Sequence, residues 1–156
     1  MPTPEALAND ARRLQGLFDR MPPVAALGLR VERLDAQRLR LVAPLARNVN
    51  DKGCAFGGSL ASALTLAGWG VLEIALHRAG EAAEVYIADS RLDYLAPLYD
   101  DLCIEAAWPE PEAFAGLRAK LAARGRGGLL LQAEASDANG RVVTRLEGRY
   151  AAIRRG

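Results

Sequence analysis

The sequence predicts an α+β fold in which an antiparallel sheet wraps around one long apolar helix. From Gly53 to Leu72 the chain carries no charged residue, and a helix that is apolar on all sides belongs in a protein core. Several other segments alternate apolar and polar residues, which is typical of strands with one face on the core and the other in solvent. We therefore expect these strands to supply the surface that encloses the helix.

The N-terminal segment is predicted to form a short amphipathic helix. Thr3 stands before a proline and a glutamate, which is a common helix start, and apolar residues follow at helical spacing. Met21-Pro22-Pro23 is expected to end this helix. The chain is accordingly divided into a flanking helix over residues 1–21 and a single domain over residues 22–156.

Period-two alternation predicts six strands. The first two form a hairpin, with Leu27, Leu29 and Val31 on the core side of its first strand and a turn at Asp35-Ala36-Gln37. Four more follow the long helix, over Val85–Leu95, Leu102–Trp108, Leu129–Ser136 and Val142–Ile153. Asp137-Ala138-Asn139-Gly140 is a strong turn signal between the last two. Helical spacing predicts a short helix over Pro111–Arg124.

Composition limits the function classes. A chain of 156 residues with 51% hydrophobic content fits one globular domain with a sizeable core. Its 20 basic residues are balanced by 19 acidic ones, so it offers no electrostatic footprint for nucleic acid or an anionic membrane. The charge-free stretch is only a marginal membrane span, and a helix buried by its own protein is the preferred interpretation.

Cysteine and histidine usage is sparse. Cys54 and Cys103 are expected to be free thiols in a reducing cytoplasm, because the sequence has no signal peptide. His77 is the sole histidine, so zinc sites of the usual Cys/His type are effectively excluded and no metal or cofactor is expected.

The most informative feature is the junction at which a polar, glycine-punctuated loop enters the long helix. The first turn of a helix presents unpaired N–H groups and the positive end of the macrodipole. Gly57 and Gly58 would let a ligand approach this backbone closely. The junction thus predicts a cradle for an oxyanion or a phosphate, although small residues also allow close packing without any ligand.

The residues of this junction carry a family resemblance. The segment Asn50–Gly58, NDKGCAFGG, has the N-x-x-G-x-x-(H)-G-G spacing of hot-dog thioesterases related to phenylacetate degradation, with Phe56 at the usual histidine position. More closely, N-x-N-D-K-G-(C/T)-A-F-x-G-S-L followed by GW resembles the YiiD-type thioesterase domain at the C-terminus of certain bacterial GNAT acetyltransferases. The later segments DYLAPLYDDL (Asp93–Leu102) and GRYAAI (Gly148–Ile153) also fit that family, so the resemblance covers Pro22 to Ile153.

The resemblance implies a hot-dog fold and hydrolysis of an acyl thioester of coenzyme A or acyl carrier protein. In such enzymes the site lies at a dimer interface, so a homodimer or a dimer of dimers is expected. By position, the Gly57 N–H, helped by Gly58 or Ser59, would stabilise the oxyanion, and Asn50 would orient the carbonyl or a water. Phe56 and Tyr94 are expected to line the acyl tunnel.

The base is the missing part of this machinery. The related enzymes place an acidic residue nine positions after the histidine, where this sequence has Thr65. A threonine hydroxyl has no acid–base function near neutral pH without activation, but it could hold a water. Asp51 is an alternative base, although an aspartate in such a turn more often bonds its own backbone.

Asp89 is a candidate for the base on an equal footing with Asp51. Because it is expected to share a strand face with Val85 and Ile87, we predict a partly buried carboxylate with a raised pKa or paired with Arg91.

Each candidate also has a purely structural interpretation. Asn50 could simply form the turn, Cys54 is favoured as a packed side chain over a nucleophile, and Tyr94 could pack on the helix. For the whole protein, the rival is a non-catalytic acyl-ligand-binding or regulatory domain, made credible by the absent helix carboxylate. A hot-dog hydratase is disfavoured because it would use a His-Asp pair, and His77 lies at the far end of the helix.

Overall fold

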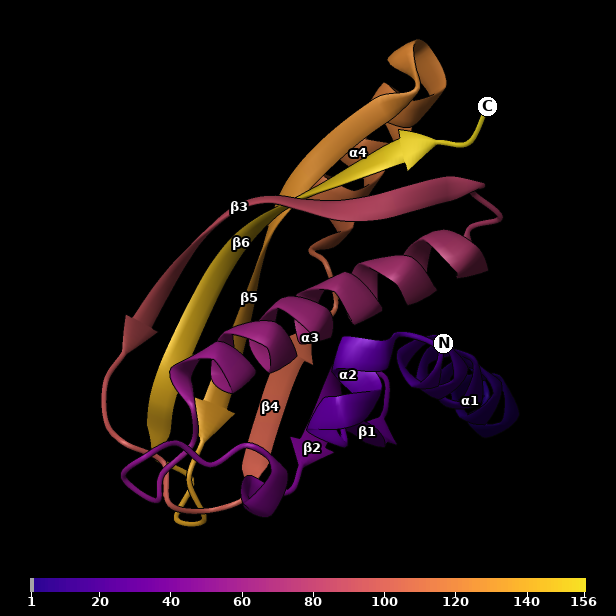
Figure 1. Cartoon of the computed structure of the whole chain (residues 1–156). Helices are drawn as coiled ribbons and strands as arrows, with labels where there is room; N and C mark the ends of the chain where they lie inside the picture. The colour runs from indigo at the N-terminus through magenta and orange to yellow at the C-terminus, as the bar shows by residue number, and fades with distance from the viewer. Residues whose placement is uncertain (1) are drawn as a thin grey trace.

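The computed structural model describes residues 2–156, and its largest element is a six-stranded antiparallel sheet in the order β1-β2-β4-β5-β6-β3. Its strands are β1 (Arg30–Leu34), β2 (Arg38–Ala43), β3 (Ala83–Tyr94), β4 (Leu102–Ala107), β5 (Arg126–Ser136) and β6 (Val142–Arg154). The sheet curves around the 22-residue helix α3 (Gly57–Arg78) (Figure 1). The predicted α+β architecture is confirmed.

Smaller elements cover the ends and one flank of this core. They are helices α1 (Pro4–Asp19), α2 (Pro22–Leu27) and α4 (Pro111–Arg124), with a single 3₁₀ turn, η1 (Leu45–Arg47). Helices α1 and α2 lie beside α3 near β1 and β2, whereas α4 packs on β5 at the opposite end of the sheet (Figure 1).

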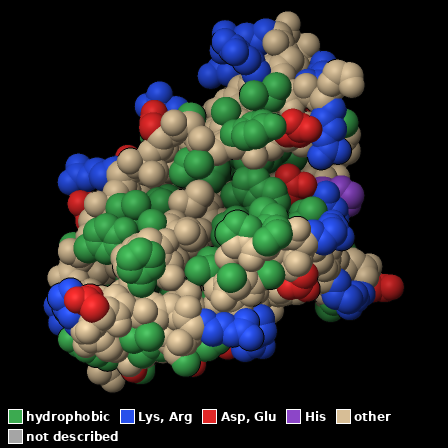
Figure 2. Space-filling view, in the orientation of Figure 1, with side chains coloured by type: hydrophobic (Ala, Val, Ile, Leu, Met, Phe, Trp, Pro, Cys, Tyr) green, Lys and Arg blue, Asp and Glu red, His purple; other side chains and the backbone are tan. Residues whose placement is uncertain are grey.

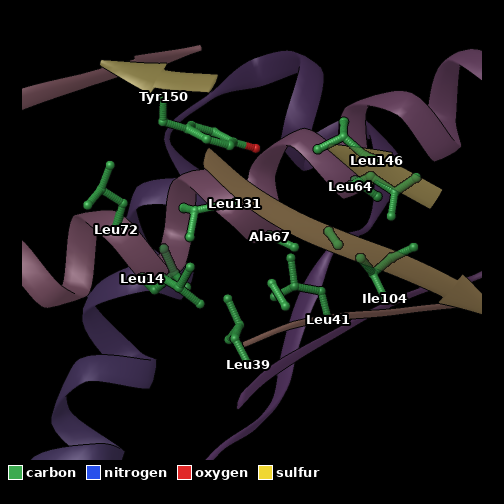
Figure 3. Close-up of a cluster of buried hydrophobic side chains, with 14 of the residues drawn as sticks. Leu14, Leu39, Leu41, Leu64, Ala67, Leu72, Ile104, Leu131, Leu146 and Tyr150 are labelled. Carbon is green, nitrogen blue, oxygen red and sulfur yellow. The ribbon is translucent and has the colours of Figure 1, made fainter. Parts of the chain in front are cut away.

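Helix α3 forms the centre of the hydrophobic core. Its inward residues, among them Leu64, Ala67 and Leu72, pack against side chains that point from the strands (Figure 3). The helix is long and apolar enough to cross a membrane by length and composition, but 67% of its most apolar window is buried inside the protein. The expected packing of this helix in the protein's own core is confirmed.

Tyr150 of β6 is inserted against the middle of α3. Its fully buried hydroxyl donates a hydrogen bond to the carbonyl oxygen of Thr65 at 2.7 Å. Gly68 makes this approach possible, because a Cβ at that position would lie 2.3 Å from the Tyr150 hydroxyl. Burial raises the pKa of the Tyr150 phenol above its ordinary value.

Helix α1 begins where the sequence predicts, with the Thr3 hydroxyl accepting a hydrogen bond from the N–H of Ala6 at 3.1 Å. Its Leu14 and Phe18 side chains are fully buried in the core.

Two ion pairs also join α1 to α3. Arg13 contacts the buried Glu73 at 3.1 Å, and Arg78 contacts the buried Asp10 at 2.7 Å. The guanidinium of Arg78 also stacks on Trp108, 4.6 Å from the ring centroid. Helix α1 therefore contributes both apolar surface and countercharges to the core.

One element differs from the sequence prediction. The segment expected to stop the first helix starts a second one, α2, which ends at Gly28 in the left-handed conformation with φ of 69°. Proline is compatible with the first turn of a helix, since the N–H that it lacks has no partner there. Leu27 therefore ends a helix, and strand β1 starts only at Arg30.

Both predicted turns are confirmed. The Asp35 carboxylate accepts the N–H groups of Gln37 and Arg38, and Asp137 accepts those of Asn139 and Arg141. Each aspartate thus closes its own hairpin.

Candidate functional site

The N-terminus of α3 carries two unpaired backbone donors. Its N-cap, Phe56, has no side chain that could accept a hydrogen bond, and its carbonyl oxygen accepts the N–H groups of Ser59 and Leu60 at 3.0 and 3.1 Å. Within residues 2–156, the N–H groups of Gly57 and Gly58 have no hydrogen-bond acceptor. These two donors are free for a ligand.

Aromatic rings lie on both sides of these glycines. The Tyr94 hydroxyl donates a hydrogen bond to the Gly57 carbonyl oxygen at 2.9 Å, and its ring lies 3.5 Å from where a Cβ of Gly57 would be. The Phe56 ring occupies the equivalent place at Gly58, 2.5 Å from a Cβ there. Both side chains are more than half exposed, Phe56 by 56% and Tyr94 by 54%. The rings of Tyr94 and Phe56 therefore occupy part of the space next to Gly57 and Gly58 that a side chain would otherwise fill.

Two uncharged hollows flank the start of α3. The first has a volume of about 330 Å³ and is lined by residues of the junction and of the segment after β3: Cys54, Ala55, Gly57, Leu60, Tyr94, Leu95, Ala96, Pro97 and Leu98. The second, of about 320 Å³, is lined by α2 and the first turns of α3: Pro23, Val24, Leu27, Phe56, Gly58, Ser59 and Ser62. Each free N–H therefore belongs to a glycine that lines one hollow, and both hollows suit an uncharged ligand.

The loop before α3 is held by its own hydrogen bonds. Asn50 Oδ1 accepts the N–H groups of Lys52 and Cys54 at 2.8 and 3.2 Å, while its Nδ2 contacts the Cys54 thiol at 3.2 Å. The Asn50 side chain is thus committed to the turn, and the buried Cys54 is packed against it. A direct role of Asn50 toward a substrate stays a prediction.

Asp51 lies at the surface beside this loop. Its side chain is 80% exposed and pairs only with the neighbouring Lys52, at 2.9 Å. No local backbone hydrogen bond occupies this carboxylate in the described residues, so the turn does not account for it.

Thr65 and Ser59 lie further along α3. Ser59 is buried and lines the second hollow. Thr65 is half-buried and eight residues beyond Gly57, about 12 Å along the helix axis. Within this chain, its hydroxyl is too far from the free N–H of Gly57 to act on the same carbonyl group.

The expectation for Asp89 is wrong. The pairing of β3 with β6 shifts register between Ile87 and Asp89, so the period-two rule fails there. The Asp89 side chain is 64% exposed and contacts Arg149 on β6 at 3.7 Å. The predicted partner, Arg91, instead contacts Asp93 at 3.4 Å. Asp89 thus faces solvent on the edge strand, away from the core.

Sequence reasoning missed several supports of the junction. The carbonyl oxygen of Asn48 accepts the Phe56 N–H at 2.7 Å, and that of Leu98 accepts the Ala55 N–H at 2.8 Å. The buried Asn48 amide also donates to the carbonyl oxygens of Leu27 and Pro44, at 2.9 and 2.8 Å. Of these, only the polar Asn48, two residues before Asn50, offered a sequence signal.

Metal ligands do not gather at this site. Among residues 2–156, no three His, Cys, Asp or Glu side chains lie close enough together to hold a metal ion.

Residues 11–154 match the family described as "Putative thioesterase (yiiD_Cterm)", which covers almost the whole chain. The protein belongs to this family. The free donors of Gly57 and Gly58 thus lie at the junction whose motif carried the sequence resemblance. The association with an acetyltransferase domain, which the resemblance also brought in, is not part of this match.

Solved structures place this YiiD-type chain among hot-dog proteins. A Chlorobaculum tepidum protein of unknown function superimposes with a TM-score of 0.90 at 26% identity, covering 96% of this chain and 97% of that one. A Shewanella oneidensis protein described as a "putative thioesterase" has a TM-score of 0.83 at 22% identity, covering 94% of this chain and 99% of that one. The predicted hot-dog fold is confirmed.

Proposed function

We propose that this protein hydrolyses acyl thioesters of coenzyme A or acyl carrier protein. The observation that carries the proposal is the pair of unpaired N–H groups, from Gly57 and Gly58, at the uncapped start of a buried helix. Membership of a thioesterase family directs the choice of ligand from a generic anion to a thioester carbonyl.

In the proposed hydrolysis, the two backbone N–H groups stabilise the negative charge that develops on the carbonyl oxygen. Water adds to the thioester carbonyl, and the negative charge develops on its oxygen, next to the two N–H groups. Collapse of the tetrahedral intermediate breaks the C–S bond and leaves a carboxylate. Of the two protons of the water, one leaves with the thiol and the other passes to solvent. Donors that are fixed by the fold need no reorganisation as charge develops, and each can lower the barrier by roughly 3 kcal/mol.

A second copy of the chain would complete the site. Strand β3 is an edge of the sheet, and its residues from Tyr86 to Arg91 are exposed on both faces. Figure 2 shows hydrophobic side chains gathered on the face that α3 and β3 share. A long edge with exposed apolar residues calls for a partner strand. We therefore propose a homodimer through β3, in which the second copy supplies a group that activates the attacking water.

A non-catalytic acyl-binding domain is the second candidate. It is favoured by one observation: no residue lining the two hollows carries a carboxylate or an imidazole. Such a site could hold an acyl thioester in the same place and leave its C–S bond intact.

The deciding experiment is thiol release from a panel of acyl-CoA thioesters of increasing chain length, with the oligomeric state measured by light scattering. The hydrolase proposal expects turnover of at least one acyl-CoA by a dimeric protein. Each acyl-CoA is also tested in a thermal-shift assay. Thermal stabilisation without thiol release would replace the hydrolase by the binding domain, and a monomer with full activity would contradict the shared site.

A further inference from the structure

The two glycines that begin α3 are joined by one peptide group, which is held from both sides. The Tyr94 hydroxyl donates a hydrogen bond to the Gly57 carbonyl oxygen at 2.9 Å, and the Phe56 ring lies 2.5 Å from where a Cβ of Gly58 would be. The hydroxyl is anchored 37 residues away in sequence, at the end of β3. The first turn of the helix is thus tied directly to the sheet.

This contact bears on a free donor, because the Gly57 carbonyl and the Gly58 N–H belong to the same peptide group. The peptide is planar and trans, so the C=O and the N–H point in opposite directions. A hydrogen bond that fixes the carbonyl oxygen therefore also fixes the direction of the N–H. It polarises the peptide as well, which makes this N–H a stronger donor.

The peptide needs such a contact more than most. Glycine samples a wider range of backbone conformations than any other residue, and here two of them adjoin. The N-cap adds no side-chain hydrogen bond that would hold the first turn, and helix ends fray.

Tyr94 is itself held rigidly. It pairs with Thr144 near the start of β6, and the next two residues, Leu95 and Ala96, both donate to the Val143 carbonyl oxygen, at 2.8 and 3.2 Å. The hydroxyl is therefore presented from a fixed backbone, although the ring is partly exposed.

We infer that Tyr94 is a positioning residue that orients the Gly58 N–H toward the developing oxyanion. This inference rests on the proposed thioester hydrolysis. It goes beyond a role in lining the first hollow, because a lining residue needs only its ring, whereas a positioning residue needs its hydroxyl.

Tyr94→Phe separates the two roles, since it keeps the ring and removes the hydrogen bond. We expect kcat to fall about tenfold with KM unchanged, because orientation matters where charge develops in the transition state. The melting temperature should stay the same, and the Gly58 amide resonance should move in a ¹H–¹⁵N correlation spectrum. Tyr99→Phe is the matched control, since Tyr99 is 63% exposed and no hydrogen bond of its hydroxyl is found within residues 2–156.

Each alternative result has a definite meaning. An unchanged kcat, or a raised KM with the Gly58 amide unmoved, would overturn the inference and leave Tyr94 as a wall of the hollow. A wild-type protein without turnover would instead contradict the proposed function. In that case the Gly58 resonance in Tyr94→Phe still decides whether the hydroxyl holds this peptide.

Discussion

The start and the middle of α3 each contain glycines, but the two regions use the missing side chain differently. In the middle, the space beside Gly68 is filled by Tyr150, and a Cβ at Gly70 would lie 3.1 Å from Leu14 and Leu39. At the start, the neighbours of Gly57 and Gly58 are partly exposed rings beside open hollows. The middle of the helix is packed for stability, whereas its start keeps backbone groups accessible.

Replacing a glycine of α3 by a larger residue should therefore have a different effect in the middle of the helix than at its start. Added volume in the middle must displace fully buried side chains, which lowers stability. Added volume at the start meets space that solvent or a ligand can reach, so it should affect binding and turnover first.

The largest effect is expected for Gly68→Ala. The new methyl group would lie 2.3 Å from the Tyr150 hydroxyl, and the buried ring has no free direction in which to move. We expect the free energy of unfolding to fall by roughly 3 kcal/mol, measured by urea denaturation.

Gly116→Ala is the matched control for this substitution. Gly116 lies inside α4, and no side chain or neighbouring element comes within 4 Å of the place that its Cβ would take. Alanine should therefore stabilise the protein by about 0.5 to 1 kcal/mol. If the Gly68 and Gly116 variants were equally stable, the middle of α3 would not be tightly packed around Gly68. The proposed difference between the middle and the start of α3 would then be wrong.

Gly57→Ala should separate activity from stability. A Cβ there would be in ordinary contact with Tyr94, at 3.5 Å, so the free energy of unfolding should change by less than about 0.5 kcal/mol. The methyl group would also stand beside the first hollow and displace a bound carbonyl, so we expect turnover to fall about tenfold or more. Steady-state kinetics on the best acyl-CoA measures this, and unchanged turnover would show that substrate does not approach Gly57.

The smallest effect is a pH-dependent change in the stability difference between the wild type and Tyr150→Phe. Near pH 8 the loss of the hydrogen bond to Thr65 should cost about 1 kcal/mol. The exposed tyrosine of the unfolded chain ionises at about pH 10, whereas burial raises the pKa of the folded Tyr150. Wild-type stability is therefore fully present below about pH 10 and falls above it, while the variant has no hydroxyl to ionise at this position.

The stability gap between the two proteins should accordingly be smaller at about pH 10.5 than at about pH 8. Urea denaturation at both values measures it. A gap that is the same at both pH values would show that the hydroxyl is not buried in the folded protein, because its pKa would then not change on unfolding.

Sequence patterning predicts the elements well where a single period dominates. The alternation in β6 places Leu146, Gly148 and Tyr150 in the core, as observed. It fails at Pro22–Leu27, because a proline pair can stop one helix and also start the next. It fails again at Asp89, because a strand irregularity reverses the face of every later residue and leaves no mark in the sequence.

The candidate site is predictable only in part. The loop and helix start were visible in the glycines and in the motif, and the motif also names the family. The hydrogen bond from Tyr94 to Gly57 was not visible, because it joins side chain to backbone across 37 residues without any periodic pattern. The hydrogen bonds from Lys52 and Cys54 to the Asn50 side chain were not visible either, because they depend on the side-chain rotamer of Asn50, which the spacing of residues in the sequence does not determine.

The phenylalanine at the N-cap of α3 has an evolutionary consequence. A serine or aspartate at position 56 would accept one of the free N–H groups and stabilise the helix by about 1 kcal/mol. That same acceptor would compete with any ligand for the donor. The chain thus forgoes an easily available gain in stability, and selection for thermostability alone would be expected to introduce a polar residue here at the expense of activity.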